Sequence, residues 1–265
     1  MIFSFTGPKD QSEWDEEIIL TRKAIQAVNA ITPRPRFFVI CGDLVDAMPG
    51  VSFKRDQVAD LKGLLTELHP DIAPVCVCGN HDIGDIPTPE SIAEYNEDFG
   101  DDYFSFWVGG VHFLVLNSQF YHDDSQSRSL RRAHDEWLDK QLQHDPSRPR
   151  QHLIGFQHIP PFVKEPNEER VDVFGSSSLS FNFGDKKQRK NYLWRLKEGG
   201  MKKLFCGHYH RNGGGFDEDL EVVVTSAIGC QLGKDESGIR LVRVLEDRVE
   251  HQYYPLHSVP TQLPL

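Results

Sequence analysis

The dominant feature of the sequence is a short, continuous apolar run that ends at a glycine and is followed at once by polar residues. Three runs have this form, at residues 36–42, 74–79 and 203–207, and a fourth, at residues 152–158, ends in a histidine instead. Continuous apolar runs of four to six residues are typical of strands that are buried on both faces of a sheet. The sequence therefore predicts a buried strand at each of these four positions.

Between these runs, hydrophobic positions recur with the period of an α-helix. Helices are predicted over residues 14–30, 58–68, 130–142 and 187–198. Strands and helices then alternate along the chain, which is typical of βαβ units with largely parallel strand pairing. The fold class is therefore predicted to be α/β.

Other stretches predict antiparallel pairing. Residues 103–117 form two apolar segments around Gly109-Gly110, which is a hairpin signal. Residues 220–226, 239–245 and 249–254 are also predicted to be antiparallel strands, so the sheet is expected to be mixed. The polar, acidic and serine-rich residues 160–185 predict a long loop over one face. Neither a repeat nor a linker divides the sequence, and we expect a single domain over residues 1–265.

Composition and charge exclude several classes of function. The net charge of −11 repels phosphate backbones, so we expect no nucleic-acid partner. No stretch approaches 18 consecutive apolar residues, so we expect no membrane span. The first residues lack the basic start of a signal peptide, and five cysteines are an odd number, which together predict a reducing, cytoplasmic compartment. The basic run at residues 186–190 predicts a solvated helix face.

Candidate chemistry gathers where the predicted strands end. In open α/β sheets, ligands bind beyond the carboxyl ends of the strands. At these ends the chain places Asp43, Asp46, Asn80, His81, Asp82, His158, His208 and His210. Each residue alone has a simpler structural explanation as a turn, a cap or a hydrogen-bonded histidine. Carboxylate, amide and imidazole groups together suit a divalent ion such as Mn, Fe, Zn or Mg, so the ordered set predicts a metal centre.

The ordered motifs resemble those of the calcineurin-like metallophosphoesterases. The motifs are Gly42-Asp43-Leu-Val-Asp46, Gly79-Asn80-His81-Asp82, His158 and Gly207-His208-Tyr209-His210. The resemblance extends over residues 37–231 and is greatest to a branch of Ser/Thr protein phosphatases. It implies a four-layer αββα sandwich with two mixed sheets.

The resemblance also implies a role for each ligand. Asp43 would bridge two metal ions. Asn80, His158 and His208 would complete the site of one ion, and His210 would bind the other. Two such ions clamp a phosphate and activate a bridging water, so a serine or cysteine nucleophile is not needed.

Four further residues have roles in or near the implied site. The resemblance implies that His81 stabilises the phosphoryl oxygens or protonates the leaving oxygen, and that Asp82 orients its ring. Asp46 would contact the ligand residues rather than a metal ion. Arg211 could contact a substrate phosphate, because guanidinium groups suit phosphate, but a solvated surface arginine is the simpler interpretation.

The chain departs from the family at one motif. Family members carry an aspartate two positions before a histidine or glutamine at the end of a first strand, whereas this chain has only the adjacent Asp10 and Gln11. Either residues 1–7 form the first strand and Asp10 acts as a ligand, or this segment lies on the surface and the strand is absent. In the second case, one metal site keeps only Asp43 and His210, and we expect impaired activity.

The sequence therefore predicts metal-dependent hydrolysis of phosphate monoesters in phosphoproteins. A phosphodiesterase is the alternative within the enzymes, since the same metal core serves both reactions. A catalytically weak scaffold that binds phosphoproteins is the alternative outside the enzymes, and the missing motif supports it.

Overall fold

The computed structural model describes residues 14–143, 145–172 and 180–263. The alternatives for residues 1–7 and Asp10 fall outside these ranges, so they stay predictions. One sheet has six strands in the order β3–β4–β5–β6–β8–β7. Its strands are β3 (Phe104–Val108), β4 (Val111–Val115), β5 (Leu153–Phe156), β6 (Lys203–Cys206), β7 (Gly213–Asp217) and β8 (Leu220–Val224). The β3–β4 and β7–β8 pairs are antiparallel and the other pairs are parallel, so the sheet is mixed, as predicted.

A second layer of strands packs against this sheet. It contains a parallel pair, β1 (Phe37–Cys41) with β2 (Ala73–Val77), and an antiparallel pair, β9 (Gly238–Val244) with β10 (Val249–Pro255). Apolar side chains from both pairs join one cluster with those of the six-stranded sheet. Within the described part of the chain, the two pairs are separate sheets rather than one continuous sheet.

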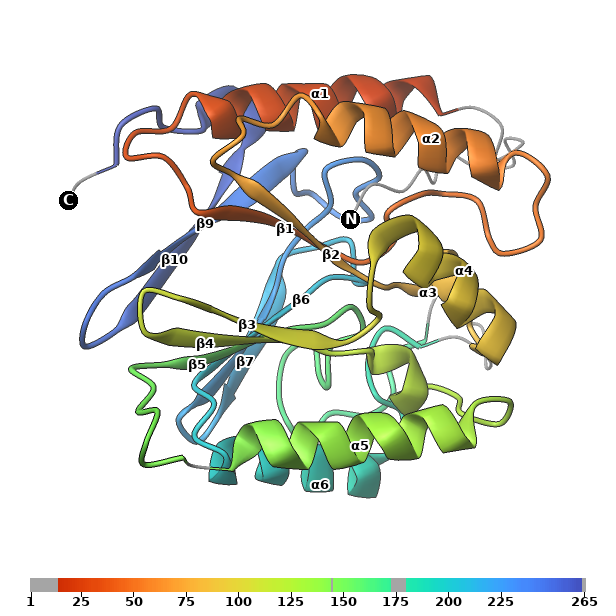
Figure 1. Ribbon diagram of the computed structural model, residues 1–265, viewed down its shortest axis with the longest axis vertical. Helices are drawn as coiled ribbons and strands as arrows, with labels where there is room; N and C mark the ends of the chain where they lie inside the picture. Colours follow the sequence, from red (N-terminus) through yellow and green to blue (C-terminus); the bar gives the residue numbers. More distant parts are fainter. Residues whose placement is uncertain (1–13, 144, 173–179, 264–265) are drawn as a thin grey trace.

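Helices cover the outer face of each strand layer, as Figure 1 shows. Helices α1 (Asp15–Asn29) and α2 (Lys54–Leu65) pack on the two strand pairs, and α5 (Arg128–Leu142) and α6 (Lys186–Glu198) pack on the six-stranded sheet. The layer order is therefore αββα, as the resemblance implied. The expected two mixed sheets are present as one mixed six-stranded sheet and a split second layer.

The predicted helices and strands agree with the structure to within a few residues, but helix α4 (Pro89–Phe99), strand β7 and several short turns were not predicted. Helices α3 (Asn80–Ile83) and α4 (Pro89–Phe99) and the 3-10 turns Ser118–Tyr121 and Leu256–Ser258 complete the fold. Helix α4 begins at Pro89, after Thr88 accepts a hydrogen bond from the backbone N–H of Ser91. Strand β7 contains three glycines and therefore carries no hydrophobic alternation. None of the described helices is long and apolar enough to cross a membrane.

The basic run at residues 186–190 is not a fully solvated helix face, which corrects the prediction. The side chain of Arg189 is completely buried. Its guanidinium group donates to the backbone carbonyl oxygens of Phe183, Pro166 and Glu168. A guanidinium group offers five N–H donors, so one buried arginine can satisfy several carbonyls of a loop at once.

The described parts of the long loop at residues 160–185 are held by a second charged residue. The carboxylate of Glu168 accepts hydrogen bonds from the backbone N–H groups of Val163 and Lys164, both at 2.8 Å, and from the side chain of Asn182. Together with Arg189, this carboxylate places the loop against the six-stranded sheet and beside the carboxyl end of β6.

The buried imidazole of His134 should make the protein sensitive to acid. Both ring nitrogens lack a hydrogen-bond partner within the described residues, and burial among aromatic rings lowers the pKa to about 4. Below pH 6.5 the imidazole of the unfolded chain takes up a proton that the folded chain does not. The free energy of unfolding therefore decreases as the pH is lowered. We expect His134→Leu to reduce the loss of stability between pH 7 and pH 5 by about 2 kcal/mol in urea titrations.

The control for this prediction is His257→Leu, because the side chain of His257 is 70 % exposed. It should leave the pH dependence of unfolding as it is in the unaltered protein. Equal pH dependence in all three proteins would contradict the assignment to His134.

Candidate metal centre

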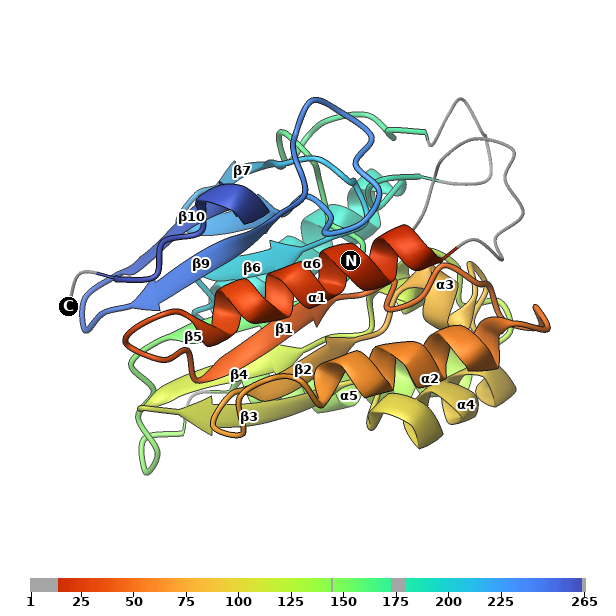
Figure 2. The ribbon, with the colours of Figure 1, turned by 90° about the horizontal axis from the view of Figure 1, so that it is seen from above.

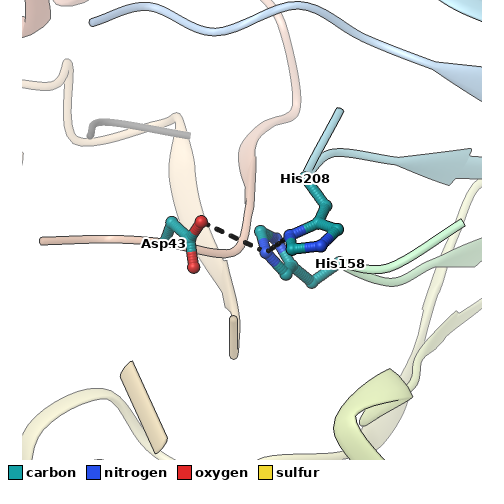
Figure 3. Close-up of side chains that lie close together, drawn as sticks. All are labelled: Asp43, His158 and His208. Carbon is teal, nitrogen blue, oxygen red and sulfur yellow. Dashed lines mark hydrogen bonds and ion pairs between the residues drawn. The ribbon is translucent and has the colours of Figure 1, made fainter. Parts of the chain in front are cut away.

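The candidate site lies where the two strand layers face each other at the carboxyl ends of four strands. Asp43 follows β1, Asn80 begins α3 just after β2, His158 follows β5 and His208 follows β6. Because β1 and β2 belong to one layer and β5 and β6 to the other, the site is built from both. Figure 3 shows Asp43, His158 and His208 turned toward one another.

The Nε2 atom of His158 is the centre of this cluster. It lies 3.2 Å from Oδ2 of Asp43, 3.1 Å from Oδ1 of Asn80 and 3.0 Å from Nδ1 of His208. The ligand atoms of Asp43, His158 and His208 all lie within 4.8 Å of one another. Two ligands about 2.1 Å from one ion and roughly 90–110° apart would be separated by about 3.0–3.4 Å. The spacing therefore fits a shared divalent ion.

The hydrogen bonds on the far side of each imidazole assign its tautomer. Nδ1 of His158 donates to the backbone oxygen of Cys41 at 2.8 Å, and Nε2 of His208 donates to the backbone oxygen of Ser180 at 3.0 Å. The nitrogens that face each other therefore carry lone pairs, as metal-binding histidines do. Four atoms with lone pairs face one buried space with no proton between them. A bound cation would offset the repulsion between these lone pairs.

The backbone at the site is held in an uncommon conformation. Asp43, His208 and His210 have positive φ angles of 48°, 64° and 53°, and they are three of the four such non-glycine residues in the described chain. Residues other than glycine adopt this region at a cost of about 1–3 kcal/mol, and such strain clusters at functional sites. The strain allows side chains that follow a strand to turn back over its end.

Two glycines allow the strand ends to approach closely. A Cβ atom on Gly42 would lie 2.3 Å from Nδ1 of His158, and a Cβ atom on Gly79 would lie 2.3 Å from the backbone nitrogen of Asp43. Glycine is therefore required at these two positions, because one ligand segment packs closely against its neighbour there.

Burial and neighbouring charge set the protonation of the cluster. Burial alone would raise the pKa of Asp43, but the nearby His158 and His81 outweigh it and hold that pKa below its ordinary value. Burial is the main cause that lowers the pKa of His208 well below its ordinary value. The carboxylate is therefore ionised and the imidazole of His208 is neutral at pH 7, as metal binding requires.

Asn80 is oriented by a carboxylate that the motif does not include. Its Nδ2 donates to Oδ1 of Asp85 at 3.0 Å, which directs Oδ1 of Asn80 toward His158. We expect Asp85→Ala to weaken metal binding by roughly 10–100-fold, because the amide loses its fixed orientation. Titration with Mn²⁺ by calorimetry measures this.

The conservative variant Asp85→Asn provides the control for this prediction. Its amide oxygen can still accept the hydrogen bond from Asn80, so it should restore most of the affinity. Equal affinity of Asp85→Ala and the unaltered protein would contradict an orienting role.

His210 lies outside this cluster. Its Nδ1 donates to the backbone oxygen of Cys230 at 2.5 Å, so its Nε2 is the nitrogen that carries the lone pair. Burial lowers its pKa to about 3, so the ring is neutral at pH 7. Across the described ranges, groups of three or more His, Cys, Asp and Glu ligands are found only at Asp43, His158 and His208. A second ion would therefore have Asp43 and His210 as its predicted ligands.

The carboxylate of Asp82 binds backbone N–H groups, and its expected role in orienting His81 stays a prediction. Its two carboxylate oxygens accept hydrogen bonds from the backbone N–H groups of Leu44 at 2.9 Å and Gly79 at 2.7 Å. Burial and the charge of Asp43 raise its pKa. Asp82 thus joins the loop after β1 to the loop after β2.

The imidazole of His81 contacts the backbone of Asp46. Its Nδ1 donates to the backbone oxygen of Asp46, and its own backbone N–H donates to Oδ1 of Asp43 at 3.0 Å. Its side chain is 12 % exposed, so it lies at the mouth of the site. Asp46 therefore supports the site through its backbone, next to the ligand Asp43.

Several supporting residues were not found from the sequence. Lys54 donates to the backbone oxygens of His81 at 2.9 Å and Asp82 at 2.6 Å. Oε1 of Gln57 accepts hydrogen bonds from the backbone N–H groups of Asp46 and Ala47. Both residues lie on α2 and act on backbone atoms, for which the sequence carries no motif.

Arg211 is engaged within the protein rather than at the site. Its Nε and one terminal nitrogen donate to the backbone oxygen of Leu232 at 3.0 and 2.7 Å, and its guanidinium lies 4.9 Å from the ring centre of Tyr209. These contacts give it a structural function, so we do not assign it to substrate phosphate.

Comparison with known proteins agrees with this geometry. The sequence profile described as "Metallophos: Calcineurin-like phosphoesterase" matches residues 17–212. The chain is 49 % identical over 256 residues to "Serine/threonine-protein phosphatase CPPED1" of Bos taurus, covering 96 % of this chain and 79 % of the relative. It is 48 % identical over 247 residues to the protein of the same name in Danio rerio, covering 93 % and 77 %.

Solved structures share the fold at low sequence identity. One is "GAP50 the anchor in the inner membrane complex of Plasmodium", with a TM-score of 0.61 and 12 % identity over 92 % of this chain and 81 % of that one. Another is a dimetal phosphatase from Danio rerio, with a TM-score of 0.55 and 15 % identity over 86 % and 85 %. Their likeness bears on the fold alone. The profile match and the identity to the curated phosphatases show that this chain belongs to the calcineurin-like phosphoesterase family.

Proposed function

We propose that the chain is a metal-dependent phosphomonoesterase that acts on phosphoserine and phosphothreonine in proteins. The observation that carries the proposal is the convergence of Asp43, Asn80, His158 and His208 on one buried point, with their lone pairs facing inward. The identity to curated Ser/Thr protein phosphatases supports the choice of substrate class.

Two sets of side chains would hold the two metal ions of such a site. Asp43, Asn80, His158 and His208 would hold one ion, and Asp43 with His210 would hold a second. Bound divalent ions supply positive charge for the phosphate and lower the pKa of water. The ion in this site is proposed to be Mn, Fe, Zn or Mg, because the donor set is oxygen and imidazole nitrogen.

His81 is the residue proposed to move a proton. Its Nδ1 hydrogen is held by the backbone oxygen of Asp46, so proton exchange with a substrate falls to Nε2. A protonated Nε2 can donate to a leaving oxygen, and the position of His81 beside Asp43 places it at the site. Asp82 serves the same step indirectly, because it joins the two loops that carry Asp43 and His81.

The proposal also includes the class of substrate and the cellular compartment of the protein. Protein substrates fit the acidic net charge of the chain, which disfavours nucleic acid. The cysteines Cys41, Cys76, Cys78 and Cys206 are free thiols, which supports a reducing compartment such as the cytoplasm.

The test compares three outcomes on the same preparation with Mn²⁺ added. Phosphate release from a phosphoserine peptide, with little hydrolysis of a bis-aryl phosphate, is the expected result. Preferential hydrolysis of the bis-aryl phosphate would replace the proposal with a phosphodiesterase. Tight binding of the phosphopeptide without phosphate release would favour a scaffold. Asp43→Asn is the control, because it removes charge from the metal centre and should lower the expected activity.

A further inference from the structure

Helix α3 is a single turn, and a side chain from another helix binds two of its carbonyl oxygens. Within the turn, the backbone N–H of Gly84 donates to the oxygen of Asn80 at 2.7 Å. The next two carbonyls, of His81 and Asp82, accept hydrogen bonds from Nζ of Lys54 at 2.9 and 2.6 Å. The last carbonyls of a helix have no partners within it, and a cation at this end is favourable. Lys54 therefore terminates the short helix that carries Asn80 and His81.

Lys54 belongs to a helix that is fixed by apolar packing. It is the first residue of α2, and Val58, Leu61 and Leu64 of the same helix are buried in one cluster with α1. Figure 2 shows α2 beginning on the same side of the molecule as α3. Lys54 and His81 are 27 positions apart in the sequence. A packed helix from a distant part of the chain therefore holds the backbone of His81.

The surroundings of Lys54 distinguish it from a solvated lysine. Burial lowers its pKa below the ordinary value of 10.5, although the nearby carboxylates of Asp82, Glu94 and Asp98 act in the opposite direction. Lys62, further along α2, has a side chain that is 48 % exposed, and its Nζ lies 3.6 Å from Oδ1 of Asp98. Exposed ion pairs of this kind contribute little to stability, so Lys62 provides a matched control for Lys54.

A second residue of α2 holds the group that the ring of His81 contacts. Gln57 is buried, and its Oε1 accepts hydrogen bonds from the backbone N–H groups of Asp46 at 3.1 Å and Ala47 at 2.9 Å. The backbone oxygen of Asp46 in turn accepts the hydrogen bond from Nδ1 of His81. Gln57 follows Lys54 by three positions, and residues at this spacing lie on one face of a helix. One face of α2 therefore fixes both the backbone of His81 and the acceptor for its ring.

We propose that Lys54 and Gln57 are positioning residues, which set the direction in which His81 presents Nε2 to a substrate. This inference rests on the proposed function, in which His81 protonates the leaving oxygen. As the serine oxygen separates from phosphorus with the electron pair of the broken bond, it takes the proton from Nε2 and leaves a neutral ring. The oxygen of the attacking water completes the phosphate. The transfer requires Nε2 within hydrogen-bond distance of the leaving oxygen, and a displacement of about 1 Å can lower the rate about 100-fold.

The choice of leaving group separates this role from support of the metal centre. A serine oxygen leaves as a strongly basic alkoxide unless it receives a proton, whereas p-nitrophenolate is a weak base and leaves without one. Loss of alignment at His81 should therefore slow hydrolysis of a phosphoserine peptide much more than hydrolysis of p-nitrophenyl phosphate. Loss of a metal ion should slow both reactions, because both substrates carry the same phosphate charge.

Lys54→Met tests the first contact, because methionine keeps an unbranched side chain but has no donor. With Mn²⁺ added, we expect kcat for the phosphoserine peptide to fall roughly 10–100-fold with little change in KM, in kcat for p-nitrophenyl phosphate or in the amount of bound Mn²⁺. Lys54→Arg should restore most of the loss, since a guanidinium group also donates to carbonyls. Lys62→Met should behave as the unaltered protein. Equal losses on both substrates, or loss of Mn²⁺, would overturn the positioning role.

A double variant tests whether Lys54 acts through His81. If it does, Lys54→Met/His81→Ala should hydrolyse the phosphoserine peptide at the same rate as His81→Ala, because the contact has no proton donor left to position. A further loss of rate in the double variant would show that Lys54 acts independently of His81, and it would overturn the proposal.

The ring of His81 gives a readout that does not depend on turnover. In ¹⁵N NMR spectra, we expect the Nδ1 proton of His81 to exchange with water at least about tenfold faster in Lys54→Met and in Gln57→Leu than in the unaltered protein. Gln57→Glu, which keeps an acceptor, should restore most of the protection. Unchanged exchange in both variants would overturn the positioning role in an active phosphatase. Faster exchange in a protein that hydrolyses no phosphoserine peptide would keep that role and reject the proposed function instead.

Discussion

Elemental analysis of the purified chain is expected to find about one tightly bound divalent ion per molecule. One ion has four predicted protein ligands, whereas a second has only Asp43 and His210 in the described structure. A second ion contributes several kcal/mol of transition-state stabilisation, so we expect turnover of an aryl phosphate with Mn²⁺ to be roughly 100-fold or more below that of a two-ion relative.

The bovine phosphatase, assayed in parallel, is the reference for this comparison. Asp43→Asn should release the remaining ion and abolish the residual turnover, because it weakens the ligand shared by both sites. Two tightly bound ions per chain with turnover equal to the reference would contradict the prediction.

Gly42→Ala is expected to destabilise the protein strongly and to prevent tight metal binding. Gly42 has a φ of 81°, and an added Cβ would lie 2.3 Å from the completely buried ring of His158. The left-handed conformation costs alanine about 1–2 kcal/mol, and displacement of a packed ring adds about 1–3 kcal/mol. Urea unfolding measures the stability, and titration with Mn²⁺ measures the affinity.

Gly50→Ala separates the two contributions. Gly50 has a similar φ of 86°, but no atom lies within 4 Å of its added Cβ. We expect it to show only the conformational cost and to bind Mn²⁺ as the unaltered protein does. If the two variants lost the same stability and both kept the ion, contact between Gly42 and His158 would not be important for the site.

The sequence predicts much of this site because the ligands follow buried strands. The apolar runs before Asp43, Asn80, His158 and His208 identify the strands, and parallel pairing brings the carboxyl ends of neighbouring strands together. The structure places these four side chains around one point. The strand ends supplied eight candidate residues, and the resemblance to the family selected these four as the ligands of one ion.

The supporting contacts could not be predicted in the same way. Lys54, Gln57 and Arg189 all bind backbone oxygens or N–H groups of distant segments, and a backbone group has the same chemistry at every position. For Asp82 the resemblance implied a role in orienting His81, and the structure adds that its carboxylate accepts hydrogen bonds from two backbone N–H groups. The neighbouring residues in the sequence do not determine which way such a side chain points.

The split of the second strand layer also required the structure. Residues 239–245 and 249–254 were expected to be antiparallel strands, and they form the β9–β10 pair. Hydrophobic alternation indicates that a strand exists, but it does not name the neighbouring strand. Among the described residues, the separation of the β1–β2 pair from the β9–β10 pair depends on pairing between distant segments, which only the folded protein shows.

The hydrogen bond from His208 to the backbone oxygen of Ser180 links the long surface loop to the chemistry of the centre. A carbonyl that accepts from the outer nitrogen of an imidazole raises the electron density on the inner one. The loop position, which is set by Arg189 and Glu168, therefore adjusts how strongly His208 donates to an ion. Changes of sequence in this loop would retune the affinity and selectivity of the centre for different metals without altering any ligand.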